Sequence, residues 1–445
     1  MKEKIWIFLL CAVLLSMNLL NTADAVGGVR KIRSKTGESV KTTEEYFKII
    51  KSGNSYTLQA CDKGDVSEEA FGQDMKLYAL AACMIDADSG RVLFSKNADE
   101  VRAMASTTKI LTCLLALEQY SLDDIVTVSE YAASMPDVQL NMQAGDKFRM
   151  YDLLLSLMLE SHNDTAVAIA EHVGGTVEQF CRMMTERARQ IGCTSSVFLT
   201  PNGLDKEIVT EQGKQKHATT AKELAMILRE CLKNEQFVAI CRSRQAMISN
   251  VANTRSYQLS NHNVLLDTME GAIAGKTGFT CDAGYCYVGA VQRNGVNYVC
   301  ALLGCGWPNN KNYKWHDMKV MIDSAQSEFC KMELPNEITN ADIFTDIPLY
   351  NMKANGVQVS RLDLNRNNYE NCTVTVREGE ILTVQYTLPE YFSKETKAGD
   401  EVGMICYKIS GQTIKNEGLT ASQTIEPMMF TDYLNVIYDS YLLAD

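Results

Sequence analysis

A chain of 445 residues is too long for one small domain, and its length predicts two or three domains. Hydrophobic residues make up 46% of the sequence and charged residues 22%, which is ordinary for a globular protein that buries a core. The net charge of -12 argues against nucleic acid as a partner, because phosphate binding needs a clustered positive surface.

The segment 1–25 has the pattern of a secretory signal. Lys2 and Lys4 precede an apolar run from Ile5 to Leu20, and Ala23-Asp24-Ala25 follows as a small-residue pattern of the kind that a signal peptidase cuts. The run is short for a membrane span of about 20 residues. We therefore expect cleavage and export to the extracellular face of the cytoplasmic membrane or the cell wall; an uncleaved anchor is the alternative.

The sequence holds 15 cysteines, which raises the question of a disulfide framework. Cysteines inside apolar runs, such as Ala82-Cys83-Met84, behave as small buried hydrophobes. No two cysteines have the CxxC spacing, so the sequence supports neither a zinc site nor a thioredoxin-like motif. We predict mostly buried free thiols, which suit a reducing or anaerobic habitat.

Residues 26–75 are polar and irregular, and we interpret them as an N-terminal extension without an assigned role. The apolar segments 77–85 and 91–94 flank turn residues and predict a β-hairpin. Apolar residues at helical spacing follow. The predicted helices are 106–120, 151–159, 164–173, 176–191 and 220–232.

The sequence then becomes strand-like. Segments 286–291 and 296–303 are rich in Val and Ala and are separated by the turn Arg293-Asn294-Gly295. A helix is predicted from about 315 to 331. Helices on both sides of antiparallel strands indicate an α/β or α+β domain spanning 76–332.

We place a boundary at Pro335, after which residues 335–427 predict a small all-β domain. Its expected strands are 373–376, 382–387, 403–408 and 413–414. The last segment, 428–445, contains an amphipathic helix from Phe430 to Leu442. This helix could make peripheral contact with a membrane, but it carries Asp432 and no Lys or Arg. Packing on the β domain or on a partner is the alternative.

Three short motifs carry candidate chemistry: Ser106-Thr107-Thr108-Lys109, Ser161-His162-Asn163 and Lys276-Thr277-Gly278. Each alone is weak, because a helix cap, a capping loop or a turn before a strand explains it. The trio in this order indicates a catalytic site.

Ser106 and Lys109 stand three residues apart on a predicted helix, so they share a face. A serine hydroxyl is a poor nucleophile until a base removes its proton, and Lys109 can reach the serine oxygen. The helix start also presents free backbone N–H groups to developing negative charge. Lys109 must be neutral to act as the base, and burial together with a second cation, Lys276, favours that state.

Ser161 and Asn163 lie in a polar break between two apolar helices. A serine there can relay a proton to a leaving amine, and an amide can bind the substrate backbone. Lys276 and Thr277 offer an ammonium and a hydroxyl to a substrate carboxylate. Gly278 permits close approach of a bound peptide to the strand.

These motifs and their surroundings resemble the low-molecular-mass penicillin-binding proteins, the serine-type D-Ala-D-Ala carboxypeptidases. The resemblance covers about 76–331 and continues more loosely into 335–427. His162 departs from it, because a small residue is usual there. The matching segments are Ala105 to Thr112, Ser161 to Asp164, Pro201 to Asp205, His217 to Ala221, Asn261 to Leu266, Gly275 to Cys286 and Ala398 to Gly403.

The resemblance implies a penicillin-recognising α/β (α+β) fold, with a central antiparallel sheet between helical layers, followed by a β-sandwich. It implies that Ser106 attacks the D-Ala-D-Ala carbonyl of a peptidoglycan stem peptide and releases D-alanine through an acyl-enzyme, and that β-lactam antibiotics inhibit the protein. The backbone N–H groups of Ser106 and Phe279 would form the oxyanion hole. No metal and no cofactor is needed.

One departure concerns the terminal carboxylate of the substrate. The family often has an arginine downstream of the third motif that helps to hold this group, and the best-placed match here is Lys314. A lysine is a point charge where an arginine offers a fork, so the contact implied for Lys314 is a single-point one.

Other classes of protein fit less well. A class A β-lactamase would need a deacylating glutamate in an E-x-x-x-N segment between the second and third motifs, and we expect none between residues 164 and 275. A transpeptidase or endopeptidase differs only in the acceptor that reaches the acyl-enzyme. A silent wall-binding module conflicts with the intact motifs, and a Ser-His-Asp hydrolase lacks a G-x-S-x-G segment.

Overall fold

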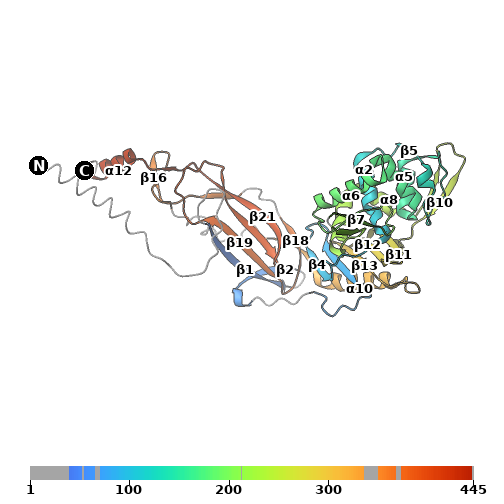
Figure 1. Ribbon diagram of the computed structural model, residues 1–445. Helices are drawn as coiled ribbons and strands as arrows, with labels where there is room; N and C mark the ends of the chain where they lie inside the picture. Colours follow the sequence, from blue (N-terminus) through green and yellow to red (C-terminus); the bar gives the residue numbers. More distant parts are fainter. Residues whose placement is uncertain are drawn as a thin grey trace.

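The structure is a computed structural model and describes residues 40–442 except 53–54, 66–70, 212, 335–348 and 367–371. The expected signal segment and the boundary at Pro335 lie outside the described residues. Figure 1 shows a lobe of helices and strands, here called the α/β domain, and an elongated lobe of strands, here called the β domain.

Five antiparallel strands form the sheet of the α/β domain, in the order β11-β12-β13-β3-β4. Both predicted hairpins are confirmed, because β3 pairs with β4 and β12 pairs with β13. Strand β11 lies at one edge of the sheet. The strands are β3 (Ala81–Asp86), β4 (Val92–Lys96), β11 (Ala272–Thr280), β12 (Gly284–Arg293) and β13 (Val296–Leu303).

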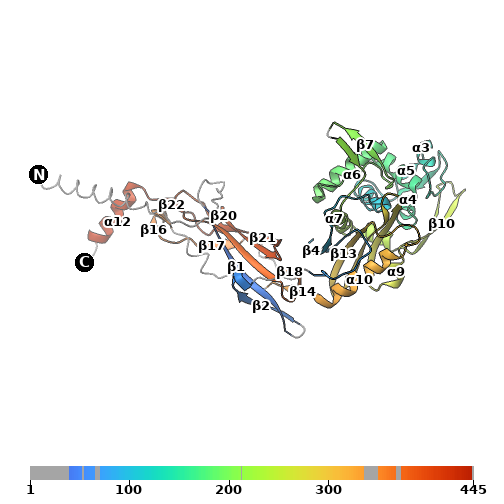
Figure 2. The same cartoon turned by 60° about the horizontal axis from the view of Figure 1, so that its bottom comes forward.

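Helices cover both faces of this sheet (Figures 1 and 2). One face packs against α2 and the helices that follow it, and the other packs against α10 (Tyr313–Glu328). This layering confirms the predicted fold class. The helices are η2 (Ala105–Thr108), α2 (Lys109–Gln119), α3 (Glu130–Ala133), α4 (Met150–Leu159), α5 (Asn163–Gly174), α6 (Val177–Ile191), α7 (Ala221–Cys231), α8 (Glu235–Arg242) and α9 (Leu265–Thr268).

Local sequence explains several helix boundaries. The side chains of Thr176, Thr220 and Asn234 accept hydrogen bonds from backbone N–H groups in the first turns of α6, α7 and α8. Gly192 ends α6 with a φ of 100°, which glycine adopts without a Cβ clash. The five helices predicted between residues 106 and 232 are present, whereas α8 and the short helices α3 and α9 were not predicted.

The helix predicted to run to residue 331 ends earlier, at Glu328. The next residues form β14 (Phe329–Glu333), which pairs with β18 (Thr373–Arg377). The prediction was wrong here because the pairing partner lies far along the chain, where no local pattern reveals it.

The β domain is built from both ends of the described chain. Its six-stranded sheet has the order β17-β21-β20-β19-β1-β2, and Figure 1 shows the blue N-terminal strands beside orange C-terminal ones. The interpretation of residues 26–75 as irregular was therefore wrong for 40–52 and 55–61. Ile49 of β1 is fully buried in the β-domain core, and the partners of β1 were too distant in sequence to foresee. The strands are β1 (Val40–Ser52), β2 (Ser55–Cys61), β17 (Leu364–Arg366), β19 (Ile381–Pro389), β20 (Glu401–Ile409) and β21 (Gln412–Ala421).

Shorter elements complete the described chain. A three-stranded sheet has the order β16-β15-β22, and three two-stranded ribbons extend from the α/β domain. Their bounds, with one further helical turn, are β15 (Met352–Ala354), β16 (Val357–Val359), β22 (Glu426–Pro427), β5 (Ile125–Thr127), β6 (Lys147–Arg149), β7 (Glu207–Thr210), β8 (Gly213–Lys216), β9 (Gln245–Ser249), β10 (Ser256–Ser260) and η1 (Lys63–Asp65).

Polar contacts hold the two domains together. The guanidinium of Arg91 forms a buried ion pair with Glu380 and donates to the Thr375 carbonyl at 2.5 Å. The side-chain amide of Gln412 both donates to and accepts from the backbone of Val92, at 2.8 Å in each case. The β domain is thus fastened to the β4 edge of the sheet.

The predicted C-terminal helix is present as α12 (Phe430–Leu442). The side chains of Phe430, Leu434, Ile437 and Tyr438 are exposed by between 43% and 69%. Within the described residues, no helix is both long and apolar enough to span a bilayer.

The cysteines of the described residues are all free, and most are buried. Burial raises the pKa of thiols such as Cys83 and Cys241 to about 12. The prediction of buried free thiols is confirmed for this part of the chain.

Candidate active site

The three motifs meet where the edge strand β11 passes the helices of one sheet face. Ser106 lies in η2, a 3-10 turn that leads directly into α2, whose first residue is Lys109. Ser161 and Asn163 lie at the junction of α4 and α5, and Lys276 lies on β11.

Lys109 is the centre of the site. Its side chain is fully buried, and Nζ lies 2.9 Å from Ser106 Oγ, 2.9 Å from Asn163 Oδ1 and 2.5 Å from the Asn202 carbonyl oxygen. Ser106 Oγ donates to the same carbonyl at 3.2 Å. Side chains three residues apart align in a 3-10 turn, so the contact predicted between Ser106 and Lys109 is present.

The electrostatics of the site favour a neutral Lys109. Burial lowers the pKa of Lys109 well below its ordinary value, the charge of Lys276 lowers it further, and Asp164 opposes both effects. Burial also lowers the pKa of Lys276, to about 7. A buried neutral lysine beside a serine hydroxyl can accept its proton.

The second motif is anchored to the loop 136–142. Asn163 Nδ2 donates to two carbonyls of this loop at 3.1 and 3.0 Å. The fully buried carboxylate of Asp164 accepts two backbone N–H groups from the same loop at 3.0 and 3.2 Å. These bonds fix the Asn163 side chain with its oxygen toward Lys109. This role of Asp164 was not predicted, although the residue directly follows the motif.

Ser161 has an uncommon conformation, with a φ of 71°. Its Oγ is buried and has no hydrogen-bond partner among the described residues. A buried hydroxyl without a partner costs stability, and strained residues gather at functional sites. The hydroxyl of Ser161 is therefore available to a bound molecule.

Two glycines let chain segments press against the nucleophile. A Cβ atom on Gly278 would lie 2.8 Å from the Ser106 backbone nitrogen, and one on Gly203 would lie 2.1 Å from the Ala105 carbonyl oxygen. Gly278 thus makes room for the backbone of Ser106, a role that was not predicted from the sequence. That it also admits a bound peptide stays a prediction.

A buried histidine supports the turn that carries Ser106. His217 Nδ1 accepts the Leu199 N–H at 3.0 Å, so its Nε2 carries the proton and donates to Thr108 Oγ1 at 2.8 Å. Thr108 Oγ1 in turn donates to the Ala105 carbonyl at 2.8 Å. Burial lowers the pKa of His217 to about 3, so the ring is neutral.

The predicted substrate-binding residues of β11 divide between its two faces. Lys276 and Gly278 alternate with Thr277 and Phe279, and successive strand residues point to opposite faces. Gly278 faces Ser106, whereas the ring of Phe279 lies 4.6 Å from that of its cross-strand neighbour Tyr285.

Lys314 lies in the first turn of α10, away from the Ser106–Lys109 pair. Its Nζ is 4.7 Å from the ring centroids of both Tyr285 and Trp315 and donates to the Lys311 carbonyl. Burial lowers its pKa to about 8. In the described part of the chain, no hydrogen bond or ion pair joins Lys314 to Thr277.

Glu230 and Asn234 do have the E-x-x-x-N spacing, which our sequence interpretation passed over. In the structure Glu230 forms ion pairs with Arg187 and Lys233, and Asn234 caps α8. These are structural roles, so the segment supplies no deacylating base.

A serine beside a buried lysine, at the start of a helix that packs on an antiparallel sheet with helices on both faces, is the arrangement of a penicillin-recognising serine peptidase. The sequence model of the family described as D-alanyl-D-alanine carboxypeptidase, peptidase S11, matches residues 48–306. The chain belongs to this family. It is a serine-type D-Ala-D-Ala carboxypeptidase that acts in cell-wall remodelling.

Individual relatives agree with this assignment. D-alanyl-D-alanine carboxypeptidase DacF of Bacillus subtilis is 26% identical over 371 residues, which are 80% of this chain and 88% of that protein. DacB2 of Mycobacterium tuberculosis is 32% identical over 219 residues, 49% of this chain and 72% of that protein. The crystal structure of DacD from Francisella tularensis shares the fold, with a TM-score of 0.60 over 83% of this chain and 99% of that one, at 22% identity.

Proposed function

We propose that Ser106 forms the acyl-enzyme with the D-Ala-D-Ala end of a peptidoglycan stem peptide. The observation that carries the proposal is the 2.9 Å contact between Ser106 Oγ and the buried Nζ of Lys109, whose pKa is lowered. Neutral Lys109 accepts the hydroxyl proton while Oγ bonds to the carbonyl carbon of the penultimate D-alanine. The backbone N–H groups of Ser106 and Phe279 stabilise the resulting oxyanion.

The C–N bond then breaks and the terminal D-alanine leaves. Its nitrogen takes up the proton held by Lys109, relayed by the hydroxyl of Ser161, which has no other partner in the described chain. Water next attacks the ester carbonyl and gives a proton to Lys109. As the ester C–O bond breaks, Lys109 returns a proton to Ser106 Oγ and the shortened stem departs.

The terminal carboxylate of the substrate is held from the β11 side of the site. Lys276 supplies an ammonium below a pKa of about 7, and Thr277 supplies a hydroxyl. A β-lactam carries a carboxylate and a strained amide carbonyl. Lys276 and Thr277 would bind the carboxylate, Ser106 would attack the carbonyl, and a stable ester would result.

The test is intact-protein mass after brief exposure to penicillin. We expect an adduct of one drug molecule on the wild type and none on Ser106→Ala, with D-alanine released from a soluble pentapeptide by the wild type alone. An adduct on Ser106→Ala would contradict the assignment of the nucleophile. Rapid consumption of the drug without an adduct would indicate a β-lactamase instead.

We further propose export through the segment 1–25 and peripheral membrane contact through α12. The exposed Phe430, Leu434, Ile437 and Tyr438 follow helical spacing, and the charge of Asp432 is paired with Lys353 at 2.9 Å. Contact would depend on apolar burial, since α12 has no Lys or Arg.

Two measurements test these proposals. A mature protein recovered from the cell envelope that begins after Ala25 would support export, and an intact N-terminus would contradict it. Sedimentation with phosphatidylcholine vesicles should persist at high salt and be lost in Ile437→Ser. Equal sedimentation of the variant would overturn the membrane contact.

A further inference from the structure

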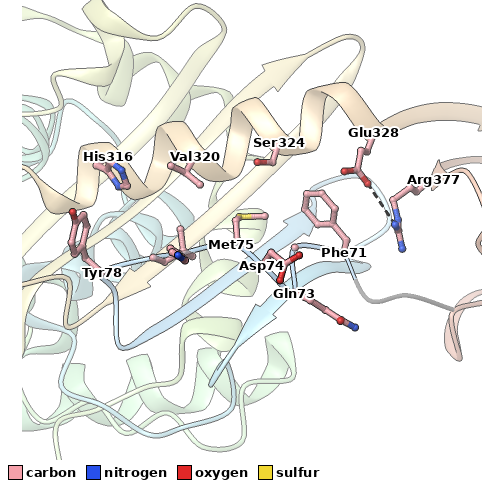
Figure 3. Close-up of a pocket in the computed structure, with 13 residues that line it drawn as sticks. Phe71, Gln73, Asp74, Met75, Tyr78, His316, Val320, Ser324, Glu328 and Arg377 are labelled. Atoms are coloured by element: carbon pink, nitrogen blue, oxygen red, sulfur yellow. Dashed lines mark ion pairs between the residues drawn. The ribbon is translucent and has the colours of Figure 1, made fainter.

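A long groove runs along the outer surface of α10, on the opposite side of the sheet from Ser106 (Figure 3). Its volume is about 970 Å³. One wall is a single ridge of α10, formed by every fourth residue: His316, Val320, Ser324 and Glu328. The other wall is the segment 71–78, and Arg377 of β18 lies at one end. None of these residues belongs to the three catalytic motifs.

The shape of the groove suits a linear polymer. Residues 316 to 328 of an α-helix span roughly 18 Å at 1.5 Å per residue. Figure 3 shows Tyr78 and His316 at one end of the groove and the Glu328–Arg377 ion pair at the other. A recess of this length exceeds what one sugar or one amino acid would fill.

The groove is lined by equal numbers of acidic and basic side chains. Asp74 and Glu328 are matched by Lys76 and Arg377, and Glu328 already pairs with Arg377 at 3.5 Å. A polyanion or a polycation would meet as much repulsion as attraction along this surface. The groove therefore fits an uncharged chain that can both stack and form hydrogen bonds.

One end of the groove offers a rigid aromatic platform. The ring of Tyr78 stacks on that of Tyr313 with centroids 3.7 Å apart and an angle of 13°, and His316 packs against it at 5.0 Å. The backbone N–H of Tyr78 donates to the carboxylate of the buried Asp317 at 3.1 Å, and 48% of the surface of Tyr78 stays exposed. A flat, fixed and half-exposed ring provides apolar contact at a low cost in conformational entropy.

We propose that this groove binds the glycan strand of peptidoglycan, a neutral linear polymer of N-acetylated amino sugars. Pyranose rings present flat C–H faces to Tyr78, while their hydroxyl and amide groups meet Gln73, Asp74 and Ser324. The inference rests on the proposed function, because stem peptides are attached to such strands. Binding the strand raises the effective concentration of stems at Ser106.

The test compares a soluble pentapeptide with purified sacculi freed of anionic polymers. Tyr78→Ala removes the platform and Ser324→Trp fills the groove. Tyr350→Ala, which removes an exposed and ring-paired tyrosine of the β domain, is the matched control. We expect both groove variants to release D-alanine from sacculi about tenfold more slowly, with wild-type rates on the pentapeptide. Chitohexaose, an uncharged hexamer of N-acetylglucosamine, should bind the wild type and the control in calorimetry and bind both groove variants at least about tenfold more weakly.

Loss of pentapeptide activity in the wild type would defeat the proposed function, whatever the groove does. An active wild type whose groove variants keep full activity on sacculi and full affinity for chitohexaose would overturn the inference about the groove. Chitohexaose that binds the wild type and all three variants alike would place the glycan site elsewhere.

Discussion

A Cβ atom on Gly278 would lie 2.8 Å from the backbone nitrogen of Ser106, closer than real Cβ contacts come. The edge strand and the nucleophile therefore touch through bare backbone, and the Ser106 N–H is the group that we expect to stabilise the oxyanion. Any side chain at position 278 must push one away from the other.

We predict that Gly278→Ala slows acylation by penicillin about 100-fold, because a shift of about 1 Å between strand and nucleophile misplaces the oxyanion hole. Stopped-flow or quench-flow acylation measures the rate, and a melting curve confirms folding. Gly64→Ala, where a Cβ would meet no atom within 4 Å, is the control. An acylation rate in Gly278→Ala equal to that of the control would contradict the geometry.

The pH dependence of kcat/KM should report on Lys276. Its pKa of about 7 means that the ammonium is present below that pH and is lost as the pH rises through it. Attraction of the substrate carboxylate is lost with it, so kcat/KM should fall on the basic side by up to about tenfold per pH unit. An arginine at position 276 keeps its charge at higher pH, so in Lys276→Arg the fall in kcat/KM should begin at a higher pH. An unchanged basic limb in this variant would refute the assignment.

Glu380 should contribute strongly to stability because it neutralises Arg91 inside the domain interface. Both side chains of the pair are nearly inaccessible to solvent. Glu380→Ala leaves a buried charge unpaired and should lower the free energy of unfolding by about 3–5 kcal/mol. Urea denaturation measures this change, with exposed Glu378→Ala as the control. A loss no larger than that of the control would show that water replaces the carboxylate.

Buried His217 should make the protein sensitive to acid. Its pKa is about 3 in the folded protein and near 6.5 in the unfolded chain. The unfolded chain binds the proton more readily between these values, so stability falls as the pH drops below about 6.5. Each pH unit costs about 1.4 kcal/mol.

His217→Gln removes this titration. The variant should therefore lose about 2 kcal/mol less than the wild type between pH 7 and pH 5. Denaturation at both pH values measures the difference. Identical losses would mean that other groups carry the acid sensitivity.

Local patterns allowed much of the site to be predicted. The three-residue spacing of Ser106 and Lys109 predicted their contact, and the polar break after α4 located Asn163. The carbonyl of Asn202 could not be foreseen as a partner of Lys109, because a backbone oxygen has no residue signature. The contact between Gly278 and Ser106 joins segments far apart in the sequence, so only the assembled fold reveals it.

The fold divides in the same way. The helix expected over 220–232 and the two hairpins depend on neighbouring residues, and these elements were predicted correctly. The pairing of β1 with β19 was missed, because strand β1 alone mixes charged and apolar residues without a clear alternation. Its burial is decided by a partner strand at the other end of the chain.

That pairing joins Val40 to Pro389 in one ladder, so the whole α/β domain is an insertion between two neighbouring strands. A chain that emerges from its N-terminus can complete the α/β domain while β1 still waits for its partner. Until the last strands arrive, the edge of β1 that pairs with β19 in the folded protein is unpaired and open to the wrong neighbour. We therefore expect the β domain to assemble last, and a chain that stops short of β19 to hold a complete α/β domain beside a β sheet that lacks the partner of β1.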